Sequence, residues 1–553
     1  RFSRIKKKVT MLHQLAAMSS VGVSIRSVGG AGRPVTHPRN PLDRTLSRWR
    51  GMVASCESAG RSERSRKFSS LGLAALAAYG GLRRGARRSP ARTGGLRATA
   101  TAEVAEKWFE EQAERSSSSK FAERGLKTLK ELEAPKRNQE PFRYTDLDAL
   151  LYSVPTGSDS NEVDLAKSLP SMLEDLGAEV HHLLPESEKV YRLVFVDGQL
   201  HSGFSLPPPW WDAMVGGLGK AQDWSEKSQS HLETLLKELP EVDIFQSNQR
   251  DRLGCGKLAA LNQAVFRDVA YVSLPEEDAP QDVTLELVFV STGTCTSPRI
   301  VLHVGSGRSL KVIESHLSLD ESDEALCNGL CRVIADEDAQ VQHEVLQQKS
   351  EASRFFSSIT AEVASGGRYD LRVVQSGAKA SRINVAVALD GEKASCDLKA
   401  VMLADQTQQL DLHSLIHHRV PSCRSNQEHK NLVGGSAECI FKGIIKVDAE
   451  AQQTESNQIV RSLLLTKKSK VKAMPSLQIQ ADEVTCAHGA ALTQLDPEEL
   501  FYLASRGLDA ANARRLMLSG FPMDLLQGLK EQMPKGYERV MAKLTKMAES
   551  NTD

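Results

Sequence analysis

Two residues in the last hundred positions, Cys486 and His488, have the types and the spacing to bind a metal ion. They flank one alanine in the stretch Asp482-Glu-Val-Thr-Cys-Ala-His-Gly489. In a β-strand, residues two apart point to the same face, so the thiol and the imidazole would lie side by side. A thiolate with an imidazole suits a soft or borderline transition metal, but two ligands do not complete a site. A partner or ligands from elsewhere would have to complete it, and the spacing alone leaves open that the pair binds no metal.

Three further histidines, His413, His417 and His418, precede Cys423. On a helix, His413 and His417 would share a face. The surrounding pattern instead predicts a strand and a corner, so we favour a structural role for this group.

The cysteines do not form a disulfide framework, because nine of them are scattered over 553 residues. We therefore expect reduced thiols. Cys327 and Cys331 form a CxxxC motif without a third cysteine nearby, whereas a structural zinc site needs two pairs of ligands. We interpret these two as small buried side chains.

Nucleotide and hydrolase motifs are absent from the sequence. Gly219-Lys220 and Gly256-Lys257 are followed by Ala221 and Leu258, where a P-loop requires Ser or Thr. No GxSxG, HExxH or GxGxxG motif occurs in a suitable context. We expect a chain that is not an enzyme and binds no nucleotide.

Charge divides the chain into two unlike parts. Residues 1–100 carry 21 Lys/Arg and 3 Asp/Glu, which leaves 49 basic and 67 acidic residues in the remainder. An Arg-, Ser- and Ala-rich segment that is nearly free of acids is typical of an organelle transit peptide, with a mature start near residues 98–104. A nucleic-acid-binding basic tail is the alternative for this leader. The acidic remainder argues against nucleic acid as the main partner. The sequence contains no run of about 20 apolar residues, so it predicts no membrane-spanning helix.

The elements that would carry these residues follow from hydrophobic periodicity. Helices are predicted within residues 101–135, 146–152 and 230–239, and Asp197-Gly198 predicts a hairpin between two short strands. From about Ala270, runs of Val, Ile and Leu recur about every 8–12 residues without long helices between them, which indicates a sandwich, a barrel or a β-solenoid. Polar corners at residues 404–409 and 450–458 favour the solenoid.

The last 60 residues are predicted to be helical. Asp496-Pro497 begins one helix that Gly507 ends, and Asp509 begins a second that Gly520 ends. A third amphipathic stretch runs from about Met523 to Lys546. Such a helical group at the end of a β-body could shield an open sheet end or dock a partner.

The C-terminal half resembles the SufB/SufD family of iron–sulfur cluster assembly proteins, and within it the SufD branch. The resemblance is close over residues 405–525 and rests on these motifs: Gln409-Leu-Asp-Leu-His413, Ser425-Asn-Gln-Glu-His-Lys430, Phe441-Lys-Gly-Ile-Ile-Lys-Val447, Met474-Pro-Ser-Leu-Gln-Ile-Gln-Ala-Asp-Glu-Val484, Cys486-Ala-His-Gly-Ala490 and Leu500-Phe-Tyr-Leu-Ala-Ser-Arg-Gly507. SufB-like chains have a Cys and a Glu where this chain has Val460 and Gly489. Neither side chain can bind metal or sulfur, which indicates SufD.

The resemblance implies a mostly β fold with flanking helices, built on a right-handed parallel β-helix. It divides the chain into a leader (1–100), an N-terminal helical and mixed α/β region (101–265), the β-helix (266–494) and a C-terminal helical domain (495–553). The implied function is a non-catalytic scaffold subunit of a plastid SufBCD-type complex, with the mitochondrial matrix as the alternative location.

Partners and site residues also follow from the resemblance. The β-helix would pair with a SufB-like chain, and His488 and Cys486 would form or adjoin the site of a transient iron–sulfur cluster shared with that partner. Helices around Phe501, Tyr502 and Arg506 would dock a SufC-like ATPase; packing of Phe501 and Tyr502 inside the helical group is the alternative.

Two rival functions remain. One is an adaptor that holds only the SufC-like ATPase and contributes no cluster ligand. The other is a β-helix enzyme that acts on polysaccharides, which the 5% aromatic content and the Arg-rich leader disfavour.

Overall fold

The computed structural model describes residues 102–114, 120–152, 191–206, 226–239, 253–274 and 282–551. The predicted transit peptide at residues 1–100 lies outside the described residues. The elements follow one another in this order: α3 (Ala102–Ala113), α4 (Lys120–Glu131), η1 (Glu140–Phe142), η2 (Asp148–Tyr152), β1 (Tyr191–Val196), β2 (Gln199–Leu200), α6 (Glu226–Lys237), α8 (Gly256–Val265), β3 (Val269–Leu274), β4 (Asp282–Ser291), β5 (Arg299–Val304), β6 (Ser309–Ser318), β7 (Leu326–Ala335), β8 (Gln340–Gln348), β9 (Arg354–Val363), β10 (Arg368–Gln375), β11 (Ala380–Leu389), β12 (Ser395–Ala404), β13 (Gln409–His418), β14 (Arg424–Val433), β15 (Glu438–Val447), β16 (Thr454–Leu464), β17 (Lys470–Ile479), β18 (Val484–Gln494), α9 (Pro497–Ser505), α10 (Ala510–Gly520), α11 (Met523–Gln532) and α12 (Pro534–Ser550).

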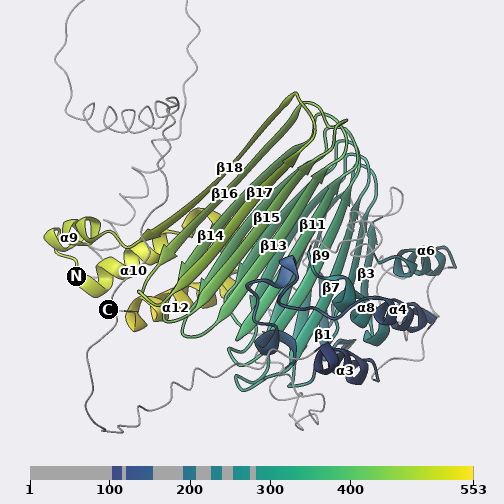
Figure 1. The fold of residues 1–553 in the computed structure, drawn as a ribbon, viewed down its shortest axis with the longest axis horizontal. Coiled ribbons are helices and arrows are strands. Elements are labelled where there is room, and N and C mark those ends of the chain that lie inside the picture. Colours follow the sequence, from purple (N-terminus) through teal and green to yellow (C-terminus); the bar gives the residue numbers. More distant parts are fainter. Residues whose placement is uncertain are drawn as a thin grey trace, which may run out of the picture. The chain divides into compact units, whose positions relative to one another are not determined.

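Two sheets of parallel strands form the body of the described chain (Figure 1). The even-numbered strands β4 to β18 continue into β1 and β2 as a 10-stranded sheet, and the odd-numbered strands β3 to β17 form an 8-stranded sheet. From β3 onward, consecutive strands alternate between the two sheets, and neighbours within a sheet are two places apart and parallel. At the start of the 10-stranded sheet, β1 pairs in parallel with β4 and antiparallel with β2. This arrangement is a parallel β-solenoid with helices before and after it, so the predicted mostly β fold is confirmed.

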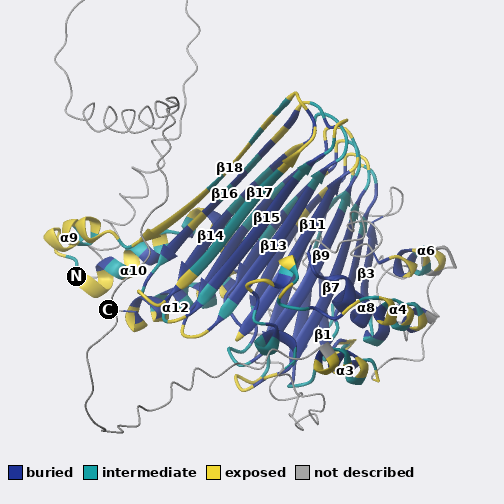
Figure 2. Ribbon diagram, viewed as in Figure 1, coloured by how far each residue is buried: buried dark blue, intermediate teal, exposed yellow. Residues whose placement is uncertain are grey.

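The interior of the solenoid is the main hydrophobic core, because alternate residues of every strand point inward. Equivalent positions stack from coil to coil: Ile383 pairs with Leu412, and Leu412 pairs with Phe441. All three side chains are buried in one cluster that runs through both sheets. Burial is accordingly deepest along the middle strands of the body, as Figure 2 shows.

Helices cover the outer face of each sheet. The N-terminal elements α3, η2 and α8 pack on the 8-stranded sheet around Phe356, Leu415 and Ile444. Helices α10, α11 and α12 pack on the 10-stranded sheet around Val401 and Leu432. The C-terminal helices thus lie against an outer face of the solenoid, whereas the sequence left open that they would shield the end of the sheet.

Three local expectations are corrected by the structure. Residues 523–546 form two helices rather than one, because Pro534 lacks the N–H that would continue α11 and instead begins α12. The polar stretch at residues 450–458 is a corner only as far as Gln453, since β16 begins at Thr454. The predicted helix at residues 146–152 is a single π-helical turn, Asp148–Tyr152.

Other expectations are confirmed. Asp197 and Gly198 form the hairpin turn between β1 and β2, with φ of 49° and 80°. Asp496 caps α9, since its side chain accepts a hydrogen bond from the Glu498 N–H. Within the described residues, none of the eight cysteines is in a disulfide bond. No helix in these residues has the length and apolar character needed to cross a membrane.

Candidate functional site

Cys486 and His488 lie on β18, the last strand of the 10-stranded sheet. They pair in register with Ser456 and Gln458 of β16, both of which are buried. Because register partners in a parallel sheet share a face, both candidate ligands lie on the inner face of the solenoid. The same-face prediction made from their spacing is therefore confirmed.

This end of the solenoid is uncovered in the described part of the chain. Every residue of β17 and β18 is exposed or half-buried, whereas the corresponding strands of the preceding coil are mostly buried. Figure 2 shows β18 as a largely exposed strand along one edge. The inner face that other coils hide is thus accessible here, and β18 carries backbone N–H and C=O groups that a further strand could pair with.

The two candidate ligands differ in their surroundings. Cys486 is half-buried against a small hydrophobic cluster that includes Ile445 and Val484. Burial raises the pKa of the Cys486 thiol, although a backbone hydrogen bond from Ser456 opposes this shift, so the thiol is protonated at neutral pH. His488 is exposed, and its ring has no hydrogen-bond or ion-pair partner among the described residues.

A column of polar side chains continues inward from this pair. Gln458 is fully buried beside His488, and neither atom of its carboxamide has a hydrogen-bond partner within the described ranges. Gly443 on the facing sheet makes room for it, because a Cβ there would lie 2.1 Å from Gln458 Nε2. One coil further in, Ser414 Oγ donates to Gln427 Oε1 over 2.8 Å. Polar side chains therefore line the interior of the solenoid in the coils next to Cys486 and His488.

The structure separates the three histidines that the sequence groups together. His413 faces outward and lies in a buried network, 3.0 Å from Arg382 and 2.9 Å from Asp411. His417 also faces outward and lies 2.6 Å from an oxygen of Asp448. His418 faces the core and contacts Ser425 Oγ at 2.9 Å. Each has a local structural partner, and they do not form one site.

Of the residues expected to dock an ATPase, Phe501 and Tyr502 lie on α9, and Arg506 is the C-cap residue directly after it. Phe501 and Tyr502 are 75% and 56% exposed, and no residue of α9 is buried. The Arg506 guanidinium lies 5.2 Å from the centre of the Tyr502 ring. The alternative that Phe501 and Tyr502 pack inside the helical group is therefore wrong for the chain by itself.

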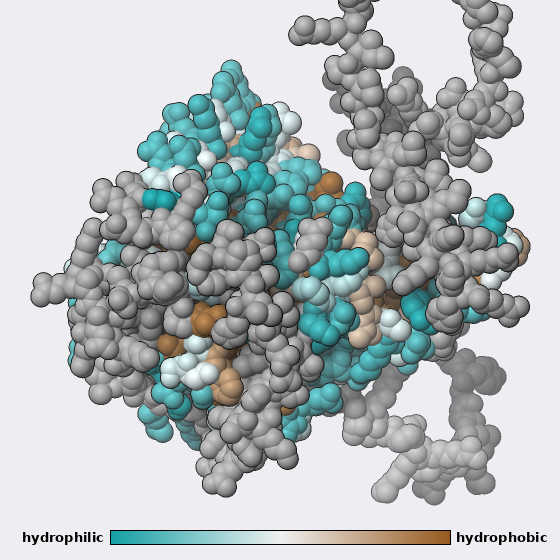
Figure 3. Space-filling view, turned by 180° about the vertical axis from the view of Figure 1, so that it is seen from behind, coloured by the Kyte–Doolittle hydropathy of each residue, from teal (hydrophilic) through white to brown (hydrophobic). Residues whose placement is uncertain are grey.

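Seen from behind (Figure 3), the described surface is mostly hydrophilic, with only small hydrophobic areas.

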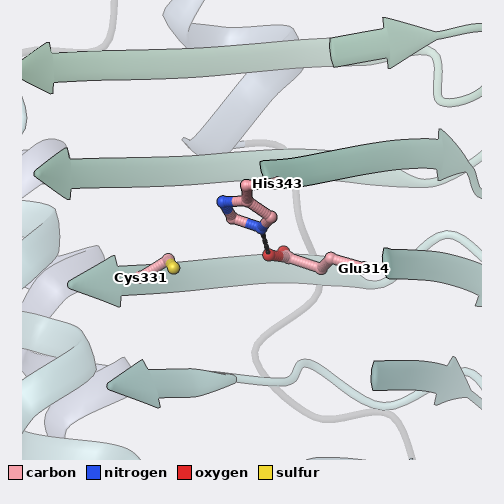
Figure 4. Close-up of side chains that lie close together, drawn as sticks. All are labelled: Glu314, Cys331 and His343. Carbon is pink, nitrogen blue, oxygen red and sulfur yellow. Dashed lines mark hydrogen bonds and ion pairs between the residues drawn. The ribbon is translucent and has the colours of Figure 1, made fainter. Parts of the chain in front are cut away.

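One cluster was missed by the sequence analysis: Glu314, Cys331 and His343 come together inside the solenoid (Figure 4). The alternation Glu314-Ser-His316 and the even spacing of Cys327 and Cys331 were available signals for inward-facing polar groups. What the sequence lacked was the register that places β6, β7 and β8 around one point.

Comparison with known proteins supports the resemblance. Residues 288–521 match the family profile described as "SUF system FeS cluster assembly, SufBD core domain". The chain carries a SufBD core domain. This match covers the solenoid from β4 onward and the first two C-terminal helices, and it includes the exposed pair on β18.

Three relatives each match more than two thirds of this chain. The chloroplastic protein ABCI7 of Arabidopsis thaliana is 26% identical over 402 residues, which is 71% of this chain and 78% of the relative. A SufBD family protein of Synechocystis is 29% identical over 414 residues (72% and 84%). The iron–sulfur cluster assembly protein SufD of Escherichia coli is 23% identical over 442 residues (78% and 94%). The chain is thus similar to proteins named as SufD and SufBD family members.

The structure describes both positions, Val460 and Gly489, at which the sequence analysis contrasts this chain with SufB-like chains. Val460 is fully buried on β16 and points into the core. Gly489 follows His488, and the space around its Cα is open. Neither offers a ligand atom, so Cys486 and His488 are the two side chains on the inner face of β18 whose types could bind a metal.

Proposed function

We propose that this chain is a non-catalytic scaffold subunit for iron–sulfur cluster assembly. It pairs through the uncovered end of its solenoid with a SufB-like chain, and Cys486 and His488 contribute to a transient cluster site shared with that partner. The observation that carries this proposal is the position of the pair on the inner face of an uncovered edge strand. Two ligands from one chain leave room for two from another.

The proposal assigns docking of a SufC-like ATPase to α9. Because no residue of α9 is buried, packing against the rest of the chain contributes little to the stability of this helix. Exposed aromatic rings such as those of Phe501 and Tyr502 often anchor protein interfaces. Arg506, the C-cap residue of this helix, adds a cation beside Tyr502. Plastid location is proposed from the basic leader and from a relative named as chloroplastic.

Co-purification with and without partners tests the proposal. The full chain is produced anaerobically with its SufB-like and SufC-like partners, and complex formation and visible cluster absorption are measured with iron and sulfide supplied. We expect a stable complex that gains cluster absorption only when this chain is present. A chain that associates with neither partner would refute the scaffold function.

The second candidate function is an adaptor that holds the SufC-like ATPase and contributes no cluster ligand. The exposed surface of α9 is the observation that favours it. His488→Ala separates the two, and Thr485→Ala on the opposite face of β18 is the matched control. We expect H488A to form the complex but lose most of the cluster absorption, while T485A keeps it. Full cluster assembly by an intact H488A complex would leave the adaptor as the function.

A further inference from the structure

A cluster of potential metal ligands lies inside the solenoid, on other strands than the pair on β18. Glu314 is on β6 and His343 on β8, both in the 10-stranded sheet, while Cys331 is on β7 in the facing sheet. Each side chain is at most 1% exposed. A carboxylate, an imidazole and a thiol thus converge on one point of an otherwise hydrophobic core.

The three ligand atoms are close enough to share one ion. The carboxylate, imidazole and thiol atoms all lie within 4.8 Å of one another, and His343 Nε2 lies 2.9 Å from Glu314 Oε2 (Figure 4). An ion held at about 2.0–2.3 Å from each ligand needs ligand atoms separated by roughly 3–4 Å, so small side-chain shifts suffice.

Neighbouring residues hold two of the ligands in orientation. The hydroxyl of Tyr369 lies 3.0 Å from His343 Nδ1, which leaves Nε2 directed at the carboxylate. His316 Nε2 contacts the other oxygen of Glu314. Ligating histidines and carboxylates in metalloproteins have such outer contacts, which fix the ring and the carboxylate plane.

The charges of the cluster suit a divalent ion. Each oxygen of Glu314 lies within hydrogen-bond distance of a histidine ring nitrogen, Oε1 near His316 Nε2 and Oε2 near His343 Nε2. One carboxylate and one thiolate together match the charge of a divalent cation, and a neutral imidazole is the third ligand.

We propose that Glu314, Cys331 and His343 bind one zinc-class divalent ion inside the solenoid. The mixture of thiolate, imidazole and carboxylate is a zinc ligand set. The three side chains fill three of the four positions of a tetrahedral zinc ion and leave one position for a water molecule. The ion joins the two sheets at β6, β7 and β8, at a place separate from the cluster site proposed for β18. Because the ligands are buried, the ion enters as the chain folds.

Metal content of the full chain tests this proposal. The protein is produced in zinc-supplemented medium, freed of loose metal by a chelator and analysed by mass spectrometry for zinc per folded chain. We expect about one zinc per chain for the wild type and at least about ten-fold less for Cys331→Ser and His343→Asn. Cys439→Ser, at another fully buried thiol of the same core, is the matched control and should keep its zinc.

Two further variants and a replacement of zinc by cobalt make the result decisive. The double variant C486S/H488A should keep its zinc, since the surface pair is a different site. Tyr369→Phe should bind zinc but release it to chelator faster, because it removes only the outer contact of His343. Cobalt supplied in place of zinc should give a thiolate-to-cobalt absorption band that C331S lacks and C439S retains. The proposal is wrong if the wild type is free of zinc, or if zinc is lost with C486S/H488A rather than with C331S.

Discussion

Arg382 shows how one residue attaches the N-terminal segment to the solenoid. Its fully buried guanidinium donates to the Pro141 carbonyl over 2.8 Å and to Thr145 Oγ1 over 3.0 Å, and it lies 4.6 Å from the centre of the Phe142 ring. Thr145 in turn donates to Asp411. The segment that contains η1 and η2 is therefore held on the 8-stranded sheet by a buried network centred on the Arg382 guanidinium.

Replacing Arg382 by Met should destabilise the chain strongly. The change leaves Asp411 buried without its cation, and such losses cost about 3–5 kcal/mol in the free energy of unfolding. Denaturant unfolding measures the loss, and hydrogen exchange should show faster exchange in residues 140–152. The control is Arg424→Met, whose exposed pair with Glu455 should contribute at most about 1 kcal/mol. Equal effects of the two changes would contradict the assigned role of Arg382.

Buried histidines make stability depend on pH. Burial lowers the pKa of His418 from its ordinary 6.5 to about 4, and that of His429 to about 3. Below pH 6.5 these residues bind protons in the unfolded chain but not in the folded one. Their contribution to stability is therefore constant above that pH and falls as the pH drops towards 4.

The pH dependence should weaken when one of these histidines is removed. His418→Gln keeps a side chain that can bond to Ser425 but no longer titrates. Between pH 6.5 and 5, the variant should lose up to about 2 kcal/mol less of its free energy of unfolding than the wild type. Urea unfolding across this range measures it, and parallel pH profiles for the two proteins would contradict the expectation.

Single residues were predicted from sequence where local spacing was sufficient. Cys486 and His488 share a face because they are two apart in a strand, and Asp496 caps α9 as its neighbours indicated. Glu314 and His343 could not be joined in this way. Their proximity depends on the register between β6 and β8, which pairs Val312 with His343 and thereby brings Glu314 close.

At the scale of elements, the corners of the solenoid stack as tightly as its strands. Gly391 lies in the corner between β11 and β12, against the corner that contains Ser365. A Cβ at Gly391 would lie 1.9 Å from the Ser365 backbone nitrogen, so the two corners could not keep their spacing.

Gly391→Ala should therefore destabilise the solenoid by about 1–3 kcal/mol, the usual cost of overpacking. Thermal and denaturant unfolding measure the loss. Gly489→Ala on β18 is the control, because a Cβ there meets nothing within 4 Å, and its effect should stay within about 0.5 kcal/mol. If the G391A and G489A proteins were equally stable, the two corners would have room to separate, which would contradict this prediction.

Most strands were predicted, because runs such as Arg299–Val304 carry the β-branched and aliphatic residues that strands favour. The first half of β16 was missed for the opposite reason. Its inward residues Thr454, Ser456 and Gln458 are polar, so the stretch has the composition of a loop. The pairing of strands two apart was not visible in any local pattern, since it depends on long-range register.

In the described part of the chain, the solenoid has two covered faces and an uncovered end at β17 and β18. Helices pack on the outer faces of both sheets, whereas β17 and β18 have no covering element within the described residues. Backbone groups on the free side of an edge strand lack the protection that a neighbouring strand gives.

Hydrogen exchange on the intact chain should report this asymmetry. We expect amides of β18 to exchange at least about ten-fold faster than those of β12 in the middle of the same sheet. Adding a SufB-like partner should slow exchange in β18 if pairing takes place there. Exchange in β18 that is already slow in the chain alone, or that the partner leaves unchanged, would argue against this edge as the contact surface.

The regular stacking of Ile383, Leu412 and Phe441, each 29 residues after the one before, has a consequence for how such chains vary in length. Adding or deleting one such repeat would preserve the identity of every inward and outward position on either side of it. It would move the N-terminal helices and the uncovered end apart or together by one strand spacing, about 4.8 Å. The length of the solenoid can therefore change by whole repeats without a change in the sequence or structure of either end.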